Sequence, residues 1–405
     1  MPKKTAKKTI KLCSACGESV VNHHILFVSN FLEETVGKVS DKFFNFTSKK
    51  VWREIAFLVE KFLYSFFSLL GIVRYNTDIE KALTGRSKLI WEEARRRSIP
   101  MKQVIVWGKY VEYYRARING KTFYFQSLPV PPSLPQEGYR WLDDKTTLFK
   151  KLAAGGIPVP TTKKIATWRN AVETFEKFNK PIIVKPNFGS RGRHTTTNVK
   201  TEKELAGAFS LVRQITPWVV LQEHLFGSVC RATVINNKLV GFFRANPPQV
   251  TGDNAKNIEE LIFEKNKTRP KQVSEILIND DLGDFIKRQG YVLSSILPEK
   301  ITIDLSAKTG RMYGGYTKEM LSEVHPKMHS IFEKAGEIVQ APVVGFDLII
   351  VDPTKDPDTE PWGIIECNSL PFIDLHYFAL EGPQINLAKN IWDLWDTGNN
   401  QKSSA

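Results

Sequence analysis

Short apolar segments of strand length recur along this chain of 405 residues and constrain its fold more than any other feature. Segments with a helical pattern, such as 87–98 and 145–154, lie between several of them, and no internal repeat is visible. A hairpin is expected around Asn119-Gly120. The pattern predicts a mixed α+β protein and argues against a helical bundle. The other expected strands are Gln103–Trp107, Ile182–Lys185, Trp218–Gln222, Arg231–Ile235, Lys238–Arg244, Ile301–Leu305, Phe346–Val351 and Trp362–Glu366.

Composition is that of an ordinary globular protein, with 42% apolar and 25% charged residues and enough length for two or three domains. The four cysteines are too few and too scattered for a secreted disulfide framework, and no signal peptide is recognisable. We therefore expect a reducing, cytoplasmic setting. Much of the net charge of +14 lies in the lysine-rich tail 1–11 together with scattered Lys and Arg throughout the chain, without a basic motif interleaved with aromatic residues. No nucleic-acid partner is therefore expected.

A CxxC motif, Cys13 to Cys16, lies near the start of the chain and is followed by His23 and His24. Zinc knuckles use such ligands, but they need a second ligand pair at matching spacing, and no second CxxC occurs. We favour a solvent-facing turn or an incidental pair, with zinc binding as the alternative.

The segment 54–73 is strongly apolar but contains Glu54, Glu60 and Lys61, which makes it a poor transmembrane span. A helix buried against a partner or the main body is the favoured interpretation. Attachment to a membrane surface, helped by nearby lysines, is the less favoured alternative.

A glycine-rich loop follows directly on an apolar strand that ends at Lys185. The loop reads Gly189-Ser190-Arg191-Gly192, and its glycines let backbone N–H groups converge on phosphate oxygens. Ser190 adds a hydroxyl donor and Lys185 a positive charge. No Walker P-loop pattern occurs in the chain.

Three oxygen ligands lie on two later strands that can run side by side. Asp347 belongs to an apolar strand, and Glu366 and Asn368 form a Glu-x-Asn pair whose spacing of two places both side chains on one face. Hard oxygen ligands suit Mg²⁺, which also binds nucleotide phosphates. Burying such acids without a partner is costly, which argues against a purely structural role.

These two motifs, in this order, resemble those of the ATP-grasp family. The resemblance implies that Lys145, in the run Trp141 to Lys145, is the first phosphate lysine and Lys185 the second. Gly156-Ile-Pro-Val-Pro160 is similar to the sequence that enters the nucleotide-binding lobe. The resemblance further assigns the phosphate contacts and the adenine hinge to Ser190, Arg191 and Gly192, and to Gln222, Glu223, His224 and Leu225.

Further runs resemble the cyanophycin synthetase type and the ligase half of bifunctional glutathione synthetases. They include 241–253, 258–262 and Asp374-Leu-His376, and the resemblance covers roughly residues 85–395. The chain departs from the family at Val229, where a carboxylate usually follows the hinge glycine, and at His194, where the loop normally ends in glycine. It also has Leu370-Pro371-Phe372 in place of the usual Asn-Pro-Gly.

The resemblance implies an α+β fold of the ATP-grasp type, in which two α+β lobes grip ATP. A small α/β pre-ATP-grasp domain and an N-terminal helical extension are expected to precede it. We expect the extension at 1–74, the small domain at 75–140, the ATP-grasp domain at 141–396 and a tail at 397–405. Within the ATP-grasp domain, 141–225 is the expected nucleotide lobe and 226–396 the metal and catalytic lobe.

The activity implied is an ADP-forming ligase that joins a carboxylate to an amine through an acyl phosphate, using ATP and Mg²⁺ or Mn²⁺. Arg231, Arg244 and Lys185 are the expected catalytic residues, with surface ion pairs as the alternative for the two arginines. Amino acids or short peptides are the expected substrates, and a homo-oligomer is expected. The alternatives are an ATP-grasp kinase and a catalytically silent ATP-binding scaffold.

Overall fold

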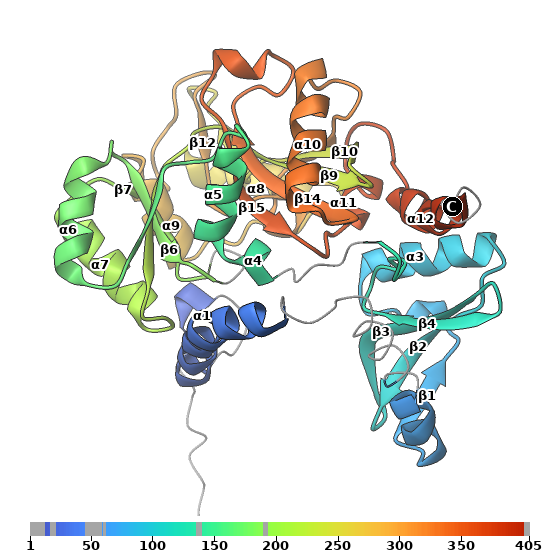
Figure 1. Ribbon diagram of the computed structural model, residues 1–405. Helices are drawn as coiled ribbons and strands as arrows, with labels where there is room; N and C mark the ends of the chain where they lie inside the picture. The colour runs from blue at the N-terminus through green and yellow to red at the C-terminus, as the bar shows by residue number, and fades with distance from the viewer. Residues whose placement is uncertain are drawn as a thin grey trace, which may run out of the picture. The chain divides into compact units, whose positions relative to one another are not determined.

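A computed structural model describes residues 13–16, 22–44, 59, 62–134, 140–188 and 193–400. The chain divides into two compact units, each with its own sheets (Figure 1). The small unit consists of Met1–Phe44, Asp143–Phe149 and Pro160–His224. The large unit consists of Asn45–Leu142, Lys150–Val159 and Leu225–Ala405.

The small unit is built on a four-stranded antiparallel sheet in the order β5-β8-β6-β7. Helices α6 and α7 pack on this sheet, and Phe175 and Leu205 join Ile182, Val184 and Leu221 in its core. The elements are β5 (Thr162–Ile165), α6 (Trp168–Lys177), β6 (Ile182–Pro186), β7 (Thr196–Val199), α7 (Glu202–Arg213) and β8 (Val219–Glu223).

Helix α1 (His23–Phe44) also packs on the small unit. Asn30 Nδ2 donates a hydrogen bond of 2.9 Å to the carbonyl of Ile215, and the Phe31 ring stacks on Trp218 with centroids 5.9 Å apart. A short 3₁₀ turn, η1 (Ser14–Cys16), precedes this helix. The N-terminal segment is thus attached to the outside of the small unit.

The large unit contains a five-stranded antiparallel sheet in the order β13-β10-β9-β14-β15. Helix α10 packs against β9 and β10, and its Phe332 contacts the rings of Phe242 and Phe346. The elements are β9 (Ser228–Ile235), β10 (Lys238–Ala245), β13 (Thr317–Glu319), α10 (Pro326–Val339), β14 (Val343–Ile350) and β15 (Gly363–Asn368).

A smaller subdomain lies between β10 and β13 in sequence and has its own apolar core, which includes Val250, Ile262, Ile286 and Leu297. A capping box at Asn257 begins its first helix, because the N-cap side chain and Glu260 satisfy each other's backbone N–H groups. The elements are β11 (Gln249–Thr251), α8 (Ile258–Thr268), α9 (Asp280–Lys287), β12 (Thr302–Asp304) and η3 (Arg311–Tyr313).

A second sheet of the large unit has four antiparallel strands in the order β1-β2-β3-β4. The elements associated with it are β1 (Val73–Asn76), η2 (Ile79–Lys81), α3 (Gly85–Arg96), β2 (Met101–Val106), β3 (Lys109–Ile118), β4 (Lys121–Phe125) and α12 (Leu387–Asn400). Asn119 and Gly120, both with positive φ, turn the chain between β3 and β4 as the sequence predicts. The remaining elements of the chain are α4 (Arg140–Asp143), α5 (Lys145–Ala154), η4 (Pro357–Thr359) and α11 (Asp374–Tyr377).

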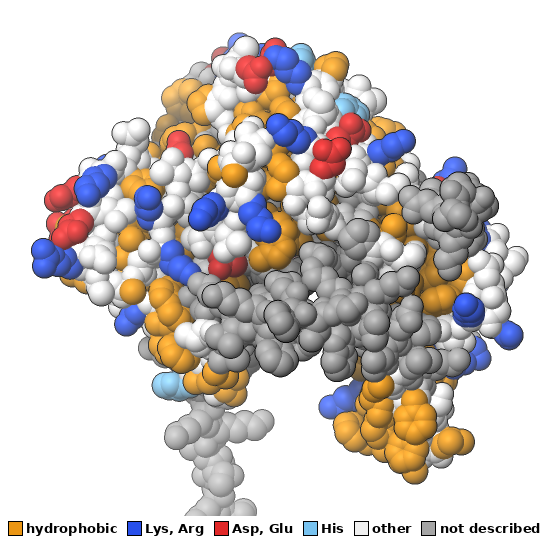
Figure 2. All heavy atoms as spheres, in the orientation of Figure 1, with side chains coloured by type: hydrophobic (Ala, Val, Ile, Leu, Met, Phe, Trp, Pro, Cys, Tyr) orange, Lys and Arg blue, Asp and Glu red, His pale blue; other side chains and the backbone are white. Residues whose placement is uncertain are grey.

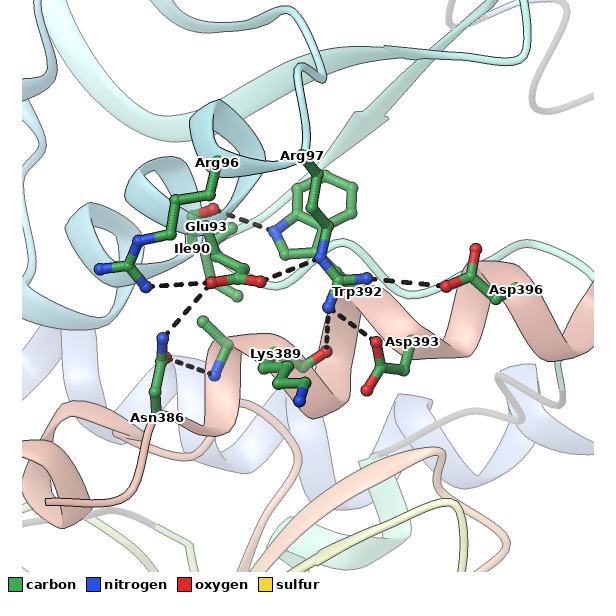
Figure 3. Close-up of polar contacts among 10 residues, drawn as sticks. Ile90, Glu93, Arg96, Arg97, Asn386, Lys389, Trp392, Asp393 and Asp396 are labelled. Atoms are coloured by element: carbon green, nitrogen blue, oxygen red, sulfur yellow. Dashed lines mark hydrogen bonds and ion pairs between the residues drawn. The ribbon is translucent and has the colours of Figure 1, made fainter.

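Helices α3 and α12 lie side by side, although their sequences are far apart (Figure 3). The buried Trp392 donates its indole N–H to the carbonyl of Ile90 at 3.0 Å. Arg97 donates to Glu93 at 3.0 Å and to Asp393 at 2.7 Å, so its guanidinium bridges the two helices. The C-terminal helix therefore completes the core next to the β1–β4 sheet.

The described part of the apolar segment 54–73 includes a helical stretch at 62–69. Tyr64 stacks on Tyr113 and Tyr124, but Phe62 and Leu69 are 69% and 87% exposed. Figure 2 shows apolar side chains gathered at the lower right, where the helical stretch 62–69 precedes β1. Among the described residues, no helix is long and apolar enough to cross a membrane. The favoured interpretation, a helix buried against a partner or the main body, and its alternative, attachment to a membrane surface, both stay untested.

Element positions agree closely with the sequence analysis, and the α+β class is confirmed. The expected helix 145–154 matches α5, and every expected strand is present with ends shifted by at most three residues. The largest differences are at β9 and β14, which each begin three residues earlier than expected. The helix expected at 87–98 begins earlier, at Gly85, because the Thr84 side chain accepts a hydrogen bond from the Ser87 N–H and caps it.

Candidate functional site

An arginine and an aspartate form the centre of the candidate site on the five-stranded sheet. Arg231 of β9 and Asp347 of β14 lie directly opposite each other in the register of the two strands. Arg231 Nε donates to Asp347 Oδ1 and Nη2 donates to Oδ2, both at 2.7 Å. The side chains are only 14% and 16% exposed. This bidentate pair fixes the orientation of the Asp347 carboxylate.

The other two predicted metal ligands come from the neighbouring strand β15. Glu366 is the cross-strand partner of Asp347, and Asn368 is the partner of Gly345. Asn368 Nδ2 donates to Asp347 Oδ2 at 3.2 Å, so the amide and the carboxylate converge, and the Asn368 carbonyl oxygen remains as a ligand. Two carboxylates and an amide oxygen on adjacent strands are a donor set that fits Mg²⁺.

Charges around this centre shift two pKa values. Burial acts to lower the pKa of Arg231, but the Asp347 carboxylate, with Glu366 and Asp374 further away, raises it overall. Burial raises the pKa of Asp374, against the opposing effect of Arg311, Arg86 and Arg231. Asp374 therefore lies within electrostatic range of the Arg231–Asp347 pair and of Arg311.

Arg244 occupies a different environment from Arg231. Its Nε donates to Ser228 Oγ at 2.9 Å and to Asn246 Oδ1 at 3.3 Å, and both acceptors are neutral. Neither of these two contacts is an ion pair, so they do not support the alternative of a surface ion pair for Arg244. Cys230, its cross-strand partner, is fully buried, and burial raises the pKa of its thiol to about 12, which argues against a nucleophilic role.

A pocket of about 630 Å³ lies between the α8–β12 subdomain and the segment that follows α11. Its walls include Lys265, Arg269, Arg311, Tyr316 and Glu381. Burial lowers the pKa of Lys265, whose Nζ donates to the Gln249 carbonyl at 2.7 Å. Three cationic side chains against one carboxylate give the pocket a positive balance that suits an anionic ligand.

The two predicted phosphate lysines belong to the small unit and lie between α5 and the end of β6. Lys145 Nζ is 3.5 Å from the carbonyl oxygen of Asn187, just beyond β6. Lys185 Nζ lies 6.0 Å from the centre of the Phe149 ring, one helical turn after Lys145. Both lysines are more than 90% buried. Asp144, whose carboxylate accepts the Thr147 N–H at 3.1 Å, caps the start of α5.

The predicted hinge residues lie at the end of β8. The Glu223 backbone N–H donates to the Thr161 carbonyl at 2.9 Å, and the Glu223 side chain accepts a hydrogen bond from the Thr161 N–H at 3.1 Å. Gln222 is fully buried and donates to Thr162 Oγ1 at 2.9 Å. The small unit ends at His224, and Leu225 is grouped with the large unit. The hinge therefore crosses the boundary between the two units in the sequence.

No family model matches the chain. It is 27% identical over 260 residues to cyanophycin synthetase from Synechocystis. That match covers 62% of this chain and 30% of the other protein. It is 26% identical over 269 residues to the glutathione biosynthesis bifunctional protein of Mannheimia succiniciproducens. That match covers 62% of this chain and 35% of the other protein. The chain thus spans about a third of the length of these relatives.

The fold is decided by a solved structure, that of a bifunctional glutathione synthetase from Pasteurella multocida. Its TM-score to this chain is 0.54 at 20% identity, and the match covers 77% of this chain and 44% of the other. The chain has the ATP-grasp fold. The expected resemblance to cyanophycin synthetase and bifunctional glutathione synthetase is confirmed.

Several predicted ATP-grasp residues stay predictions. Ser190, Arg191 and Gly192 of the glycine loop lie outside the described residues. His194, which replaces the expected glycine after the loop, has φ of 51°, in the left-handed region that favours glycine. The histidine therefore has a backbone conformation that glycine adopts more readily. Val229 lies on β9 opposite Ala245 and Ile349, and neither partner supplies the carboxylate usual at that place.

One buried polar network was not assigned a role from the sequence. Glu319 accepts a hydrogen bond from His376 Nδ1 at 2.5 Å, and His376 Nε2 is 2.7 Å from Thr233 Oγ1. All three side chains are fully or nearly fully buried. Gly241 leaves room for the histidine, since a Cβ there would lie 2.7 Å from its ring. The run Asp374-Leu-His376 was the sequence signal, but the partners of His376 come from two strands elsewhere in the chain, Thr233 from β9 and Glu319 from β13.

Proposed function

We propose that this chain is an ATP- and Mg²⁺-dependent ligase that joins a carboxylate to an amine, with ADP and phosphate as the other products. The observation that carries the proposal is the convergence of Asp347, Asn368 and Arg231 on neighbouring strands, with Glu366 directly across from Asp347. The two buried lysines of the small unit support it, because buried ammonium groups suit the phosphates of a nucleotide.

A carboxylate is a poor electrophile, because direct attack by an amine would have to expel oxide. In the proposed reaction, a carboxylate oxygen takes the γ-phosphoryl group of ATP, and ADP leaves. The amine then attacks the acyl carbon, forms the C–N bond, expels phosphate and loses a proton. Positioning and neutralisation of charge are the main tasks of the protein in such a reaction.

Each residue has a defined task in this scheme. Lys145 and Lys185 hold phosphate oxygens, and Ser190, Arg191 and Gly192 are the further phosphate contacts that the sequence predicts. Asp347, Glu366 and Asn368 would hold Mg²⁺, which when bound neutralises the charge of the phosphates. Arg231 orients Asp347 through Nε and Nη2, and its Nη1 donors are not part of that ion pair. They can therefore bind an oxygen of the acid or of the transferring phosphoryl group.

The remaining assignments concern the nucleobase and the acid. Gln222 to Leu225 would form the adenine hinge, with Glu223 accepting from the exocyclic amino group. Arg244 contacts neutral groups through its Nε in the described part of the chain and is the second arginine proposed for the acid. The pocket lined by Lys265, Arg269 and Arg311 would take the acid substrate, and its positive balance favours an amino acid or peptide with an additional carboxylate.

The test is a phosphate-release screen of the purified protein against amino acids, dipeptides and polyamines, with mass analysis of the products. An amide product with matching ADP and phosphate supports the ligase. A phosphorylated product without an amide would indicate a kinase, and ATP binding without turnover a scaffold. The expected homo-oligomer stays a prediction, which size-exclusion chromatography with light scattering would test.

Two variants test the assignments. Lys185→Ala is expected to lower turnover by on the order of 10²-fold, about 3 kcal/mol in the barrier, by analogy with removal of one stabilising donor. Lys177→Ala, at an exposed position of the same unit, is the matched control and should retain full turnover. Asp347→Ala is expected to abolish the Mg²⁺-dependent part of ATP binding in calorimetric titrations, and equal affinities with and without the substitution would place the metal elsewhere.

A further inference from the structure

Four side chains of the small unit bring sulfur and imidazole nitrogen atoms together at one point. Cys13, Cys16, His23 and His194 each offer one ligand atom, and these atoms all lie within 4.8 Å of one another. Cys16 Sγ is 3.2 Å from Nε2 of both His23 and His194, and Cys13 Sγ is 3.9 Å from His194 Nε2. The cluster joins the CxxC motif to a residue 178 positions beyond Cys16.

These distances match a tetrahedral metal site. With metal–sulfur and metal–nitrogen distances of about 2.3 and 2.0–2.1 Å, a tetrahedral zinc ion separates sulfur from nitrogen by about 3.6 Å. The three distances between sulfur and nitrogen atoms lie on both sides of that value. His24, the exposed neighbour of His23, has no part in the cluster.

The surroundings hold the ligand atoms in place. His194 Nδ1 lies 2.7 Å from the carbonyl of Leu211 and must therefore donate to it, which leaves Nε2 with the lone pair that faces the sulfurs. A backbone carbonyl bonded to the distal ring nitrogen is the usual support of a metal-binding histidine. The His194 N–H donates to the Ala15 carbonyl at 3.1 Å, and the Cys16 N–H donates to the Cys13 carbonyl at 3.0 Å, which closes the CxxC turn.

The backbone of His194 provides independent support. Its φ of 51° is a conformation that costs a histidine more than a glycine. A strained backbone that presents a ring to two cysteines and another histidine indicates that the side chain is needed. Neither an isolated CxxC turn nor a Cys13–Cys16 disulfide would require the two histidines.

We infer that Cys13, Cys16, His23 and His194 bind a structural Zn²⁺ ion that attaches the N-terminal segment to the small unit. Two thiolates and two imidazoles in a closed tetrahedral arrangement are typical of structural zinc. On this inference, the zinc alternative of the sequence analysis replaces the favoured interpretation of a solvent-facing turn or an incidental pair. The second ligand pair exists, but its last member lies far along the chain and has no CxxC signature.

The ion would also support the packing of the N-terminal segment on the small unit, because it would hold η1 in place while Asn30 and Phe31 secure α1. Removal of zinc is therefore expected to weaken the attachment of this segment.

The experiment uses the full chain without a histidine tag, purified under reducing conditions, with metal content measured by plasma mass spectrometry. About one zinc per chain is expected for wild type, and a loss of at least 80% of it for His194→Ala, in line with removal of one of four ligands. His24→Ala is the matched control and should keep its zinc. Cobalt substitution should give a thiolate-to-metal charge-transfer band and intense tetrahedral ligand-field bands.

If His194→Ala fails to fold, Cys13→Ser provides the second reading, since the Cys13 side chain is only half-buried. It should lose zinc while its far-ultraviolet circular dichroism is retained. Protein that binds no zinc when the reduced chain is supplied with it would overturn the inference. So would bound iron, a cobalt spectrum without a thiolate band, or equal zinc content in His194→Ala and His24→Ala. None of these readouts depends on turnover, so they stand apart from the proposed ligase activity.

Discussion

The ion pair between Arg231 and Asp347 allows a quantitative test of the candidate site. Both hydrogen bonds are 2.7 Å long, and the two side chains are 14% and 16% exposed. Removing one member of a buried pair costs about 3–5 kcal/mol, because the other charge is left without its partner. With the remaining exposure taken into account, we expect Arg231→Met to lower the free energy of unfolding by about 3 kcal/mol. Arg231→Lys keeps the charge but not the fork, so about half of that loss is expected.

A double-mutant cycle isolates the pair. Arg231→Met combined with Asp347→Leu should cost clearly less than the two single changes together, with a coupling energy of about 2 kcal/mol or more. Urea unfolding followed by near-ultraviolet circular dichroism measures it. Arg244→Met is the matched control on the adjacent strand, and its loss should be about 1 kcal/mol, because the Nε contacts are to neutral groups. Strict additivity of the double mutant would refute the reasoning.

Three further predictions concern folding around the site. Burial acts to raise the pKa of Asp144, but hydrogen bonds from Thr146 and Thr147 and the charge of Lys164 outweigh it, so the pKa in the folded protein is lowered. The stability that the ionised carboxylate contributes is therefore present above about pH 4 and lost as the pH falls further. Asp144→Asn should flatten that part of an acid-unfolding profile. Gly227→Ala should cost more than 2 kcal/mol in urea unfolding, since the new Cβ would lie 2.4 Å from the Ile350 backbone and φ is 130°; an unchanged midpoint would contradict this. Thr233→Val should cost about 1–3 kcal/mol by leaving His376 Nε2 without its partner, and a neutral effect would show that the network is dispensable.

Local features of the chain could be predicted because their causes are local. The strand ending at Lys185 is an apolar run, and the helix 145–154 begins after the capping residue Asp144 and ends at two glycines. The hairpin at Asn119-Gly120 follows from two residues that accept positive φ. In each case the determining interactions lie within a few residues of one another.

Contacts between distant parts of the chain could not be predicted from such patterns. The Arg231–Asp347 pair depends on the register between β9 and β14, which joins residues 116 positions apart. The docking of Trp392 on Ile90 joins positions 302 apart. His194 was visible only as a departure from the expected glycine, because its partners are near the start of the chain. The CxxC motif with His23 and the departure from the family pattern at His194 were thus two separate local features of one long-range cluster.

The proposed reaction makes one prediction that separates it from the two alternatives, a kinase and a catalytically silent scaffold. An acid substrate found in the phosphate-release screen is prepared with ¹⁸O in its carboxylate and incubated with ATP, Mg²⁺ and the amine. If an acyl phosphate forms and the amine displaces phosphate, one labelled oxygen must move from the acid to inorganic phosphate while the amide accumulates. Phosphate that carries no label, or label retained in a phosphorylated product, would contradict the account.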